Sequence, residues 1–377
     1  MYDTIGSKGG RVKNKLIMKI GIITLHRAHN YGAVLQCYAL LSTLRKISGM
    51  SVEVIDYRQS YIEDNYAVFS IRQFFRKLHS PRSILSYIID IRKRSIRKRN
   101  FENFCNNHII KSRPCKRNTI PQDYDIYVVG SDQLWATNVM RCADKVYWGY
   151  FLTNLNARKF TYAISSNNKS LEELGCAFVK HHAKNFKTLS FREKDIANMV
   201  EKMTGEICRQ DIDPVLLTDQ DDWNELIDEK WASRNYVLVY QIGSPQGDPN
   251  LLLSKAKNMV GNGNLEVIDL TPKLLSPEDF VSAFRYARFV LTTSFHGTAF
   301  SILFNRPFYT ISVNEKIDAR AFNLLKSLDI PNRLKRIESI LDEDDIDYEK
   351  VNGYLDNLKQ ISLGYLKSMT DETIGSC

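Results

Sequence analysis

Several patterns that identify common protein classes are missing from this sequence of 377 residues. It has no uninterrupted run of about eighteen apolar residues, so it predicts no transmembrane helix. The motifs GxxxxGKS/T, GxGxxG, GxSxG and HExxH are also absent. A P-loop nucleotide hydrolase, a dinucleotide-binding Rossmann domain, an α/β-hydrolase and a zinc protease therefore have no support from the sequence.

Cysteines are few and irregularly spaced. The seven cysteines include no CxxC pair and no zinc-finger spacing, and such an odd, scattered set is typical of reduced thiols in a cytoplasmic protein. We therefore predict neither a metal site nor a cofactor. Residues 1–17 contain Lys and Arg but no apolar core, so they do not resemble a signal peptide, and we predict a disordered leader.

Positive charge is concentrated near the amino terminus. Residues 1–120 contain 23 Lys and Arg against 7 Asp and Glu, whereas the whole chain has a net charge of +9. The region 70–100, which includes RKRSIRKR at 92–99, mixes these cations with aromatic and aliphatic residues. This composition favours binding to an anionic membrane surface, and a nucleic-acid-binding arm or a solvated helix face are the alternatives. We predict a cytoplasmic protein, peripheral on the inner face of the membrane, with no nucleic-acid partner.

Apolar strands alternate with helical patterns along the chain, which predicts an α/β fold with parallel sheets. A chain of 377 residues exceeds the size at which one core usually keeps growing, so two domains are expected. We predict two Rossmann-like, doubly wound domains with a cleft between them. The first covers 18–212, with a basic helical excursion at 68–110, and the second covers 213–345. A helical tail follows at 346–377, and the first long helix is expected at 33–48.

Polar residues gather after three of the predicted strands, where ligands bind in doubly wound folds. The first group lies in TLHRAHNYGAVLQ at 24–36. His26, Arg27, Asn30 and Gly32 are its candidate substrate-binding residues. Loop packing or helix capping would equally explain the histidines, and turn geometry would explain Gly32.

The second group is GSDQLW at 130–135, again directly after a buried strand. Ser131 or Asp132 could simply cap the following helix. Asp132 is also placed to accept a proton from a hydroxyl group, which makes it a candidate catalytic residue. Ser131 and Gln133 are candidates for binding the substrate.

The third group is TTSFHGTAF at 292–300, where a strand leads into a helix. His296 is the candidate proton donor, because an imidazole can exchange protons near neutral pH. Ser294 and Gly297 belong to a helix start whose N–H groups can bind an anion. Arg192, together with Lys316 and Arg320, supplies further cations near strand ends, and a surface salt bridge is the alternative for each.

These segments together resemble the polysaccharide pyruvyltransferase family. The resemblance rests on HRAHNYGAVLQCYAL, YDIYVVGSDQLW, SFRE with DPVLL further on, and SFHGTAFSILFNRPF followed by NEK, in the family's order from about residue 19 to 335. It implies a GT-B-like arrangement of the two domains with the site in the interdomain cleft. Well-studied members often have an Arg for phosphate before the His, whereas this chain has Phe295, so either the phosphate-binding cation comes from elsewhere or the donor differs.

The resemblance also implies a reaction in which pyruvate passes from phosphoenolpyruvate to a sugar and forms a cyclic ketal across two hydroxyls. The donor's phosphate and carboxylate require cations and helix N-termini, for which Arg192, Lys316 and the amides around Gly297 are candidates. Protonation of its methylene carbon requires an acid, and attack by the sugar requires a base. His296 and Asp132 are the candidates. The expected partners are phosphoenolpyruvate and a sugar acceptor carried on a lipid.

Two other functions remain open. A GT-B-type glycosyltransferase would use a nucleotide-sugar and would need a nucleoside pocket around LEVIDLTPK and TTSFHG. A basic surface-binding protein would act through residues 70–100, and substitution of His296 would leave its activity unchanged.

Overall fold

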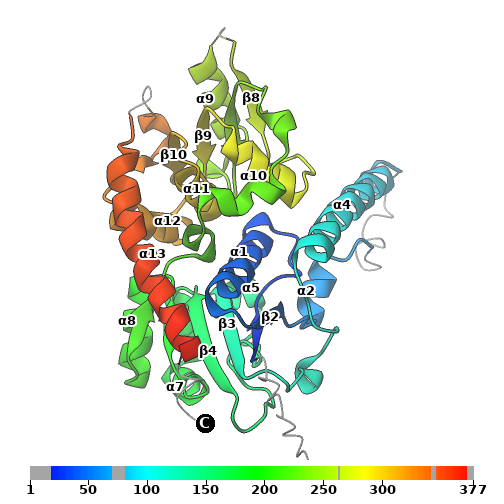
Figure 1. The fold of residues 1–377 in the computed structure, drawn as a ribbon. Coiled ribbons are helices and arrows are strands. Elements are labelled where there is room, and N and C mark those ends of the chain that lie inside the picture. Colours follow the sequence, from blue (N-terminus) through cyan, green and yellow to red (C-terminus); the bar gives the residue numbers. More distant parts are fainter. Residues whose placement is uncertain (1–17, 70–80, 262–263, 341–344, 372–377) are drawn as a thin grey trace, which may run out of the picture.

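The computed structural model describes residues 18–69, 81–261, 264–340 and 345–371. The predicted leader 1–17 and residues 70–80 of the basic region lie outside these ranges. Two parallel sheets, each packed with helices, form two lobes that lie one above the other in Figure 1. The predicted α/β fold, with two Rossmann-like domains in a GT-B-like arrangement, is confirmed.

The first sheet has six parallel strands in the order β2-β1-β3-β4-β5-β6. Ile20 of β1 pairs with Val52 of β2 on one side and with Ile126 of β3 on the other. The chain places β2 on one side of β1 and then continues from β3 to β6 on the other side. This reversal of the strand order lies between β1 and β3, and such a point places a ligand crevice at the carboxyl ends of the strands. The strands are β1 (Lys19–Ile23), β2 (Ser51–Val54), β3 (Ile126–Asp132), β4 (Arg158–Ile164), β5 (Leu189–Phe191) and β6 (Cys208–Gln210).

Helix α1 shows how the chain leaves the first strand. The Asn30 side chain accepts a hydrogen bond from the backbone N–H of Ala33, which caps the helix, and Gly49 ends it with a φ of 62°. Nearly every residue of its first three turns is buried, so the helix packs on all sides. The helices of this domain are α1 (Tyr31–Ser48), α2 (Ser60–Asn65), α4 (Pro81–His108), α5 (Thr137–Met140), α6 (Asn168–Leu174), α7 (Cys176–Ala183) and α8 (Lys194–Thr204).

The second sheet has five parallel strands in the order β11-β10-β9-β7-β8. Leu238 of β7 pairs with Val290 of β9 on one side and with Ile268 of β8 on the other, and all three are buried. Its strands are β7 (Tyr236–Tyr240), β8 (Glu266–Asp269), β9 (Phe289–Thr292), β10 (Phe308–Ile311) and β11 (Leu334–Lys335). The helices that follow are α9 (Leu251–Val260), α10 (Pro277–Arg285), α11 (Phe295–Leu303), α12 (Glu315–Ser327) and α13 (Tyr348–Asp371).

The two domains are joined by packed contacts. Tyr31 of α1 stacks on Phe280 of α10, with ring centroids 4.4 Å apart. The long helix α13 runs from the second domain down to the first (Figure 1), where the Tyr365 hydroxyl donates to the carbonyl of Thr161 at 2.9 Å. Short 3₁₀ helices occupy the connections, at η1 (Arg117–Thr119), η2 (Pro214–Leu217), η3 (Gln220–Leu226), η4 (Glu229–Trp231), η5 (Pro245–Gly247), η6 (Pro331–Arg333) and η7 (Ile337–Ser339).

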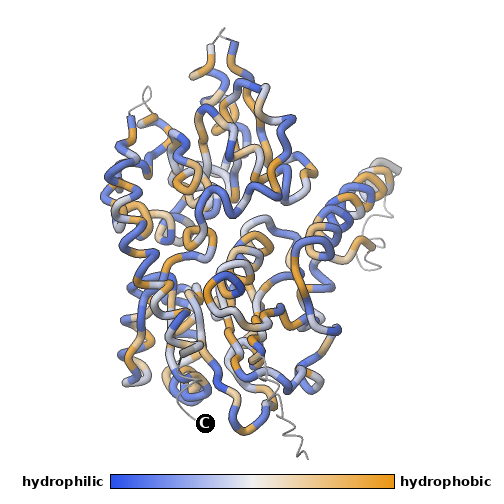
Figure 2. Tube along the Cα trace, in the orientation of Figure 1, coloured by the Kyte–Doolittle hydropathy of each residue, from blue (hydrophilic) through white to orange (hydrophobic). Residues whose placement is uncertain are grey.

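Helix α4 projects away from the body of the protein (Figure 1). Its carboxyl-terminal half is anchored, since Asn100 donates to the carbonyl of Leu274 in the second domain at 2.8 Å. Toward its outer end Leu85, Ile88 and Ile89 are 58%, 55% and 47% exposed, and Figure 2 shows hydrophobic positions there. None of the described helices is long and apolar enough to cross a membrane.

Candidate active site

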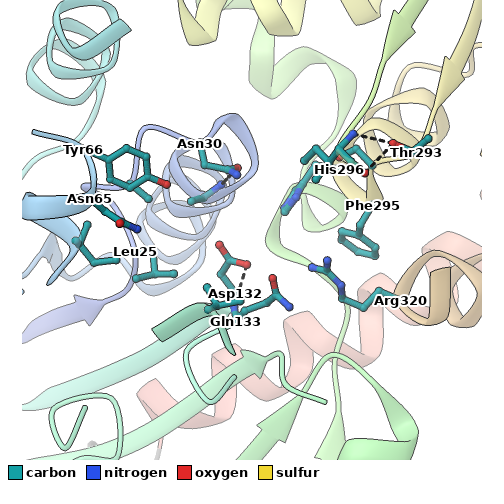
Figure 3. Close-up of a pocket in the computed structure, with 16 residues that line it drawn as sticks. Leu25, Asn30, Asn65, Tyr66, Asp132, Gln133, Thr293, Phe295, His296 and Arg320 are labelled. Atoms are coloured by element: carbon teal, nitrogen blue, oxygen red, sulfur yellow. Dashed lines mark hydrogen bonds between the residues drawn. The ribbon is translucent and has the colours of Figure 1, made fainter. Parts of the chain in front are cut away.

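A polar pocket lies between the two domains, at the carboxyl ends of β1, β3 and β9 (Figure 3). Its volume is about 190 Å³. The first domain contributes residues from the loop after β1, from α2 and from the end of β3. The second domain contributes the start of α11 and one residue of α12. Lining side chains include Asn30, Asn65, Tyr66, Asp132, Gln133, Thr293, Ser294, Phe295, His296 and Arg320.

Gly32 explains how closely the domains approach each other. It lies in the first turn of α1, and a Cβ atom at this position would be 2.1 Å from Nδ1 of His296. Any side chain at residue 32 would therefore displace the imidazole or separate the domains. Gly32 does not line the pocket, so its substrate-binding role stays a prediction; its position inside the helix shows that the close approach of His296, and not turn geometry, is what requires a glycine.

His296 belongs to a buried cluster that crosses the domain boundary. Oδ2 of Asp213 lies 2.8 Å from Nη2 of Arg192 and 3.5 Å from Nε2 of His296. Burial alone would raise the pKa of Asp213, but Arg192 and His296 outweigh it and lower that pKa to about 2. Asp213 is therefore ionised, and it pairs with the positive charge of Arg192.

Two arginines flank the ring of Phe295. The guanidinium of Arg192 lies 5.0 Å from the ring centroid, and that of Arg320 lies 5.8 Å from it. Nε and Nη1 of Arg192 are buried without a hydrogen-bond partner. Among the described residues, Arg320 has no hydrogen bond or ion pair, and burial lowers its pKa. Buried donors without acceptors are costly, so this arrangement favours an anionic ligand.

The start of α11 adds backbone donors to the same place. The Ser294 hydroxyl accepts from the N–H of Gly297 at 3.4 Å and so caps the helix. A Cβ atom at Gly297 would be 2.2 Å from Oγ1 of Thr292, which is why a glycine is required there. Ser294 lines the pocket, whereas Gly297 does not.

The residues after β3 separate into two environments. Ser131 is fully buried, and its hydroxyl donates to the carbonyl of Ala163 and accepts from Nη2 of Arg192, both at 2.6 Å. Asp132 and Gln133 line the pocket instead (Figure 3). Asp132 has a φ of 82°, an uncommon conformation for a residue other than glycine and one often found at functional sites.

His26 and Arg27 do not line this pocket. Arg27 donates to Asp56 from Nε at 2.6 Å and from Nη2 at 2.5 Å, and Nε2 of His26 lies 3.0 Å from the same carboxylate. Although burial would raise the pKa of Asp56, these partners hold it well below its usual range. The substrate-binding role of His26 and Arg27 stays a prediction, and both line a different cavity beside α4.

Lys316 lies in α12, but its side chain is outside the described residues. Asp213 of the buried cluster and two residues that line the pocket, Asn65 and Tyr66, did not emerge as candidates from the sequence. Asp213 opens DPVLL at the start of the predicted second domain, and an Asp directly before a Pro at a helix start is a local signal of a capping carboxylate. Asn65 is the last residue of the short helix α2 and Tyr66 is its C-cap, and the sequence of this helix gives no such signal.

Fold and pocket thus define a two-domain α/β protein with a pocket between the carboxyl ends of two parallel sheets, lined by Arg320 and His296. The sequence model of the polysaccharide pyruvyl transferase family matches residues 30–315. The chain belongs to this family, which implies a transferase with a saccharide acceptor.

Other comparisons add little. No curated protein matches the sequence. Similar solved structures include the UDP-GlcNAc 2-epimerase from Neisseria meningitidis, at 10% identity over 94% of each chain and a TM-score of 0.41. The glycosyltransferase SnogD from Streptomyces nogalater is 12% identical over 95% of this chain and 98% of that chain, with a TM-score of 0.38. At these TM-scores the likeness has no bearing on function.

Proposed function

We propose that this protein transfers pyruvate from phosphoenolpyruvate to a sugar of a surface-polysaccharide precursor, such as that of a capsule, and forms a cyclic ketal. The main support is the pair of arginines beside Phe295, because Arg192 has two buried guanidinium nitrogens without a hydrogen-bond partner and Arg320 lines the pocket together with His296. In the reaction one sugar hydroxyl attacks C2 of the donor while C3 takes up a proton. The second hydroxyl then attacks the same carbon, and the C–O bond to phosphate breaks.

His296 is the proposed acid that protonates C3 of the donor. Its side chain is 10% exposed, so the proton is delivered in a site from which most water is excluded. Ionised Asp213, 3.5 Å away, stabilises the charge that His296 carries before it gives up the proton. Asp132 faces His296 across the pocket and is the proposed base, or the group that orients the attacking hydroxyl (Figure 3).

Phosphate and carboxylate of the donor are proposed to bind Arg192, Arg320 and the amino-terminal turn of α11. Guanidinium groups bind such oxyanions through paired, charge-assisted hydrogen bonds. This arrangement would replace the cation that the family often carries before the histidine, where this chain has Phe295. Lys316, on the same helix as Arg320, stays a candidate for the same task. Asn30 and Gln133 are proposed to bind sugar hydroxyls from the first domain.

Helix α4 is proposed to hold the protein against an anionic membrane on the cytoplasmic side, where a lipid-linked acceptor would be found. Its exposed Leu85, Ile88 and Ile89 are spaced by three and four residues and therefore share one face. Arg92 and Lys93, one turn further along, are also exposed. An apolar face beside cations is typical of helices that lie in the membrane interface.

The test is incubation of the purified protein with phosphoenolpyruvate and a panel of lipid-linked sugars, with phosphate release and acceptor mass as readouts. We expect acceptor-dependent phosphate release and the mass gain of a pyruvate ketal. His296→Ala should abolish both, whereas His181→Ala, on the exposed surface of α7, should not. Turnover of a nucleotide-sugar in place of phosphoenolpyruvate would overturn the proposal in favour of a glycosyltransferase.

A further inference from the structure

The central pocket is small for the reaction proposed above. Its volume of about 190 Å³ falls below the range of roughly 300–1,000 Å³ typical of ligand pockets. A donor and the whole of an acceptor therefore do not fit in it together. The rest of the acceptor must extend into a neighbouring cavity.

One neighbouring cavity lies between the loop after β1 and the inner half of α4, and we call it the α4 groove. Its volume is about 670 Å³, and it shares Ala28 and Tyr66 with the central pocket, so the two spaces adjoin. Lys98, Phe101 and Glu102 of α4 form one wall, and Arg27, Arg58 and Lys111 stand on the other sides.

Four cationic side chains and two carboxylates line the α4 groove, so positive charge is in excess there. The guanidinium of Arg58 lies 3.8 Å from the carboxylate of Asp56 and 3.6 Å from that of Glu63. The ammonium of Lys98 lies 3.7 Å from the carboxylate of Glu102. Such long, partly exposed pairs are weak. Lys111 forms no ion pair within the described part of the chain, since its Nζ donates to the carbonyl of Cys105 and to the side chain of Asn106.

His29 also lines the groove, and the nearby positive charges affect its pKa. Burial, together with the nearby cations Arg97, Lys98 and Arg27, lowers its pKa to about 4. Burial likewise lowers the pKa of Lys111, which Arg27 also depresses. An anion bound between His29 and Lys111 would raise the pKa of both groups, because it favours their charged forms.

Apolar groups stand at the same groove. Val68 is half-buried, and the Phe69 side chain is 51% exposed. Helix α4 itself leads from Lys98 to the exposed Ile88, about 15 Å away at 1.5 Å per residue. A ligand that is both anionic and apolar would use all of these features.

We propose that the α4 groove binds the phosphate or diphosphate headgroup of the lipid that carries the acceptor, with the hydrocarbon chain directed along α4. This proposal rests on the proposed function for its choice of a lipid-linked acceptor. It adds the orientation of the bound acceptor. The sugar then lies in the central pocket, and the lipid extends between the loop after β1 and α4.

The test measures binding of geranyl diphosphate, inorganic pyrophosphate and geraniol to the full chain by calorimetry, without phosphoenolpyruvate. Geranyl diphosphate should bind most tightly, because only it has both the charge and the chain. Lys98→Gln and Lys111→Gln should each weaken it about ten-fold, the usual worth of a charged hydrogen bond. The His29 imidazole should show a raised pKa by NMR when geranyl diphosphate is bound.

Lys169→Gln is the matched control, since Lys169 forms an (i, i+4) pair with Glu173 at 3.7 Å, as Lys98 does with Glu102. It should leave the affinity unchanged. Equal binding of pyrophosphate and geranyl diphosphate would overturn the lipid assignment in favour of a free anion. Affinity that is insensitive to Lys98 and Lys111, or no binding at all, would overturn the site itself. Stabilisation by phosphoenolpyruvate, measured separately, would still report on the proposed function in every case.

Discussion

Two buried clusters in this protein have the same composition, one aspartate, one arginine and one histidine, yet they differ in how well their polar atoms are paired. In the first, Asp56 receives two hydrogen bonds from Arg27 and one contact from His26. The other ring nitrogen of His26 lies 3.2 Å from the carbonyl of Thr24. Both nitrogens of this histidine are therefore occupied within the first domain.

In the second cluster the same residue types leave donors unused. Nε and Nη1 of Arg192 and Nε2 of His296 are buried without a hydrogen-bond partner, although both side chains contact Asp213 at ion-pair distance. Unpaired buried groups cost free energy, so they persist where a ligand or a reaction uses them. The contrast supports the role proposed above for the second cluster at the substrate, whereas the polar atoms of His26 and Asp56 in the first cluster are paired with neighbouring residues.

Replacing each histidine by alanine tests this contrast most directly. His296→Ala should lower kcat for pyruvyl transfer by about 10²–10⁴-fold, the usual contribution of a general acid. His26→Ala should leave kcat nearly unchanged and instead lower the free energy of unfolding by about 1–3 kcal/mol, because Asp56 loses a buried partner. Steady-state kinetics and urea unfolding of both variants measure the two effects. A large loss of kcat in His26→Ala would show that the first cluster also takes part in the reaction.

A smaller effect is expected from Arg320, the unpaired cation beside Phe295. Arg320→Gln should raise KM for phosphoenolpyruvate by about 10–100-fold, as expected for the loss of a charged hydrogen bond. Arg141→Gln is the control, because Arg141 also stacks on a ring, at 4.6 Å from the centroid of Tyr61, but does not line the central pocket. If both variants kept the KM of the unaltered protein, Arg320 would have no part in donor binding.

The sequence predicted the placement of the three polar groups well, because a buried apolar run followed by Gly, Ser or Asn marks the end of a parallel strand. The strands expected from such runs are present, as in β3 and β9. The helix expected at 33–48 begins at Tyr31, since the cap is Asn30 and the glycine lies within the first turn. Strands β6 and β11 are too short to give a periodic signal, with three and two residues.

Pairing between distant residues could not be predicted in the same way. Asp213 follows β6 and interacts with Arg192, which directly follows β5, and with His296 of α11, so its role depends on how the two domains meet. Gly32 and His296 are 264 positions apart in the chain, and only the folded structure shows that one must be small for the other to fit. Local patterns thus gave the candidates, and tertiary contacts separate paired residues from unpaired ones.

The smallest expected effect concerns pH and the second cluster alone. The pKa of Asp213 is about 2 in the folded protein, below the ordinary value of 3.8, because Arg192 and His296 outweigh the effect of burial. A carboxylate with a depressed folded pKa stabilises the protein above its unfolded pKa, and this stabilisation is lost as the pH falls toward the folded value. The amount is about 2 kcal/mol, lost between about pH 4 and pH 2.

Urea unfolding of the unaltered protein and of Asp213→Asn over this pH range isolates that contribution. The unaltered protein should lose about 2 kcal/mol more than the variant, since Asn cannot titrate. Asp56, whose pKa is also held low, titrates in both proteins and cancels from the difference. Equal losses in the two proteins would mean that Asp213 is not held ionised by its partners, and the unpaired N–H groups of Arg192 would then have to be explained without it.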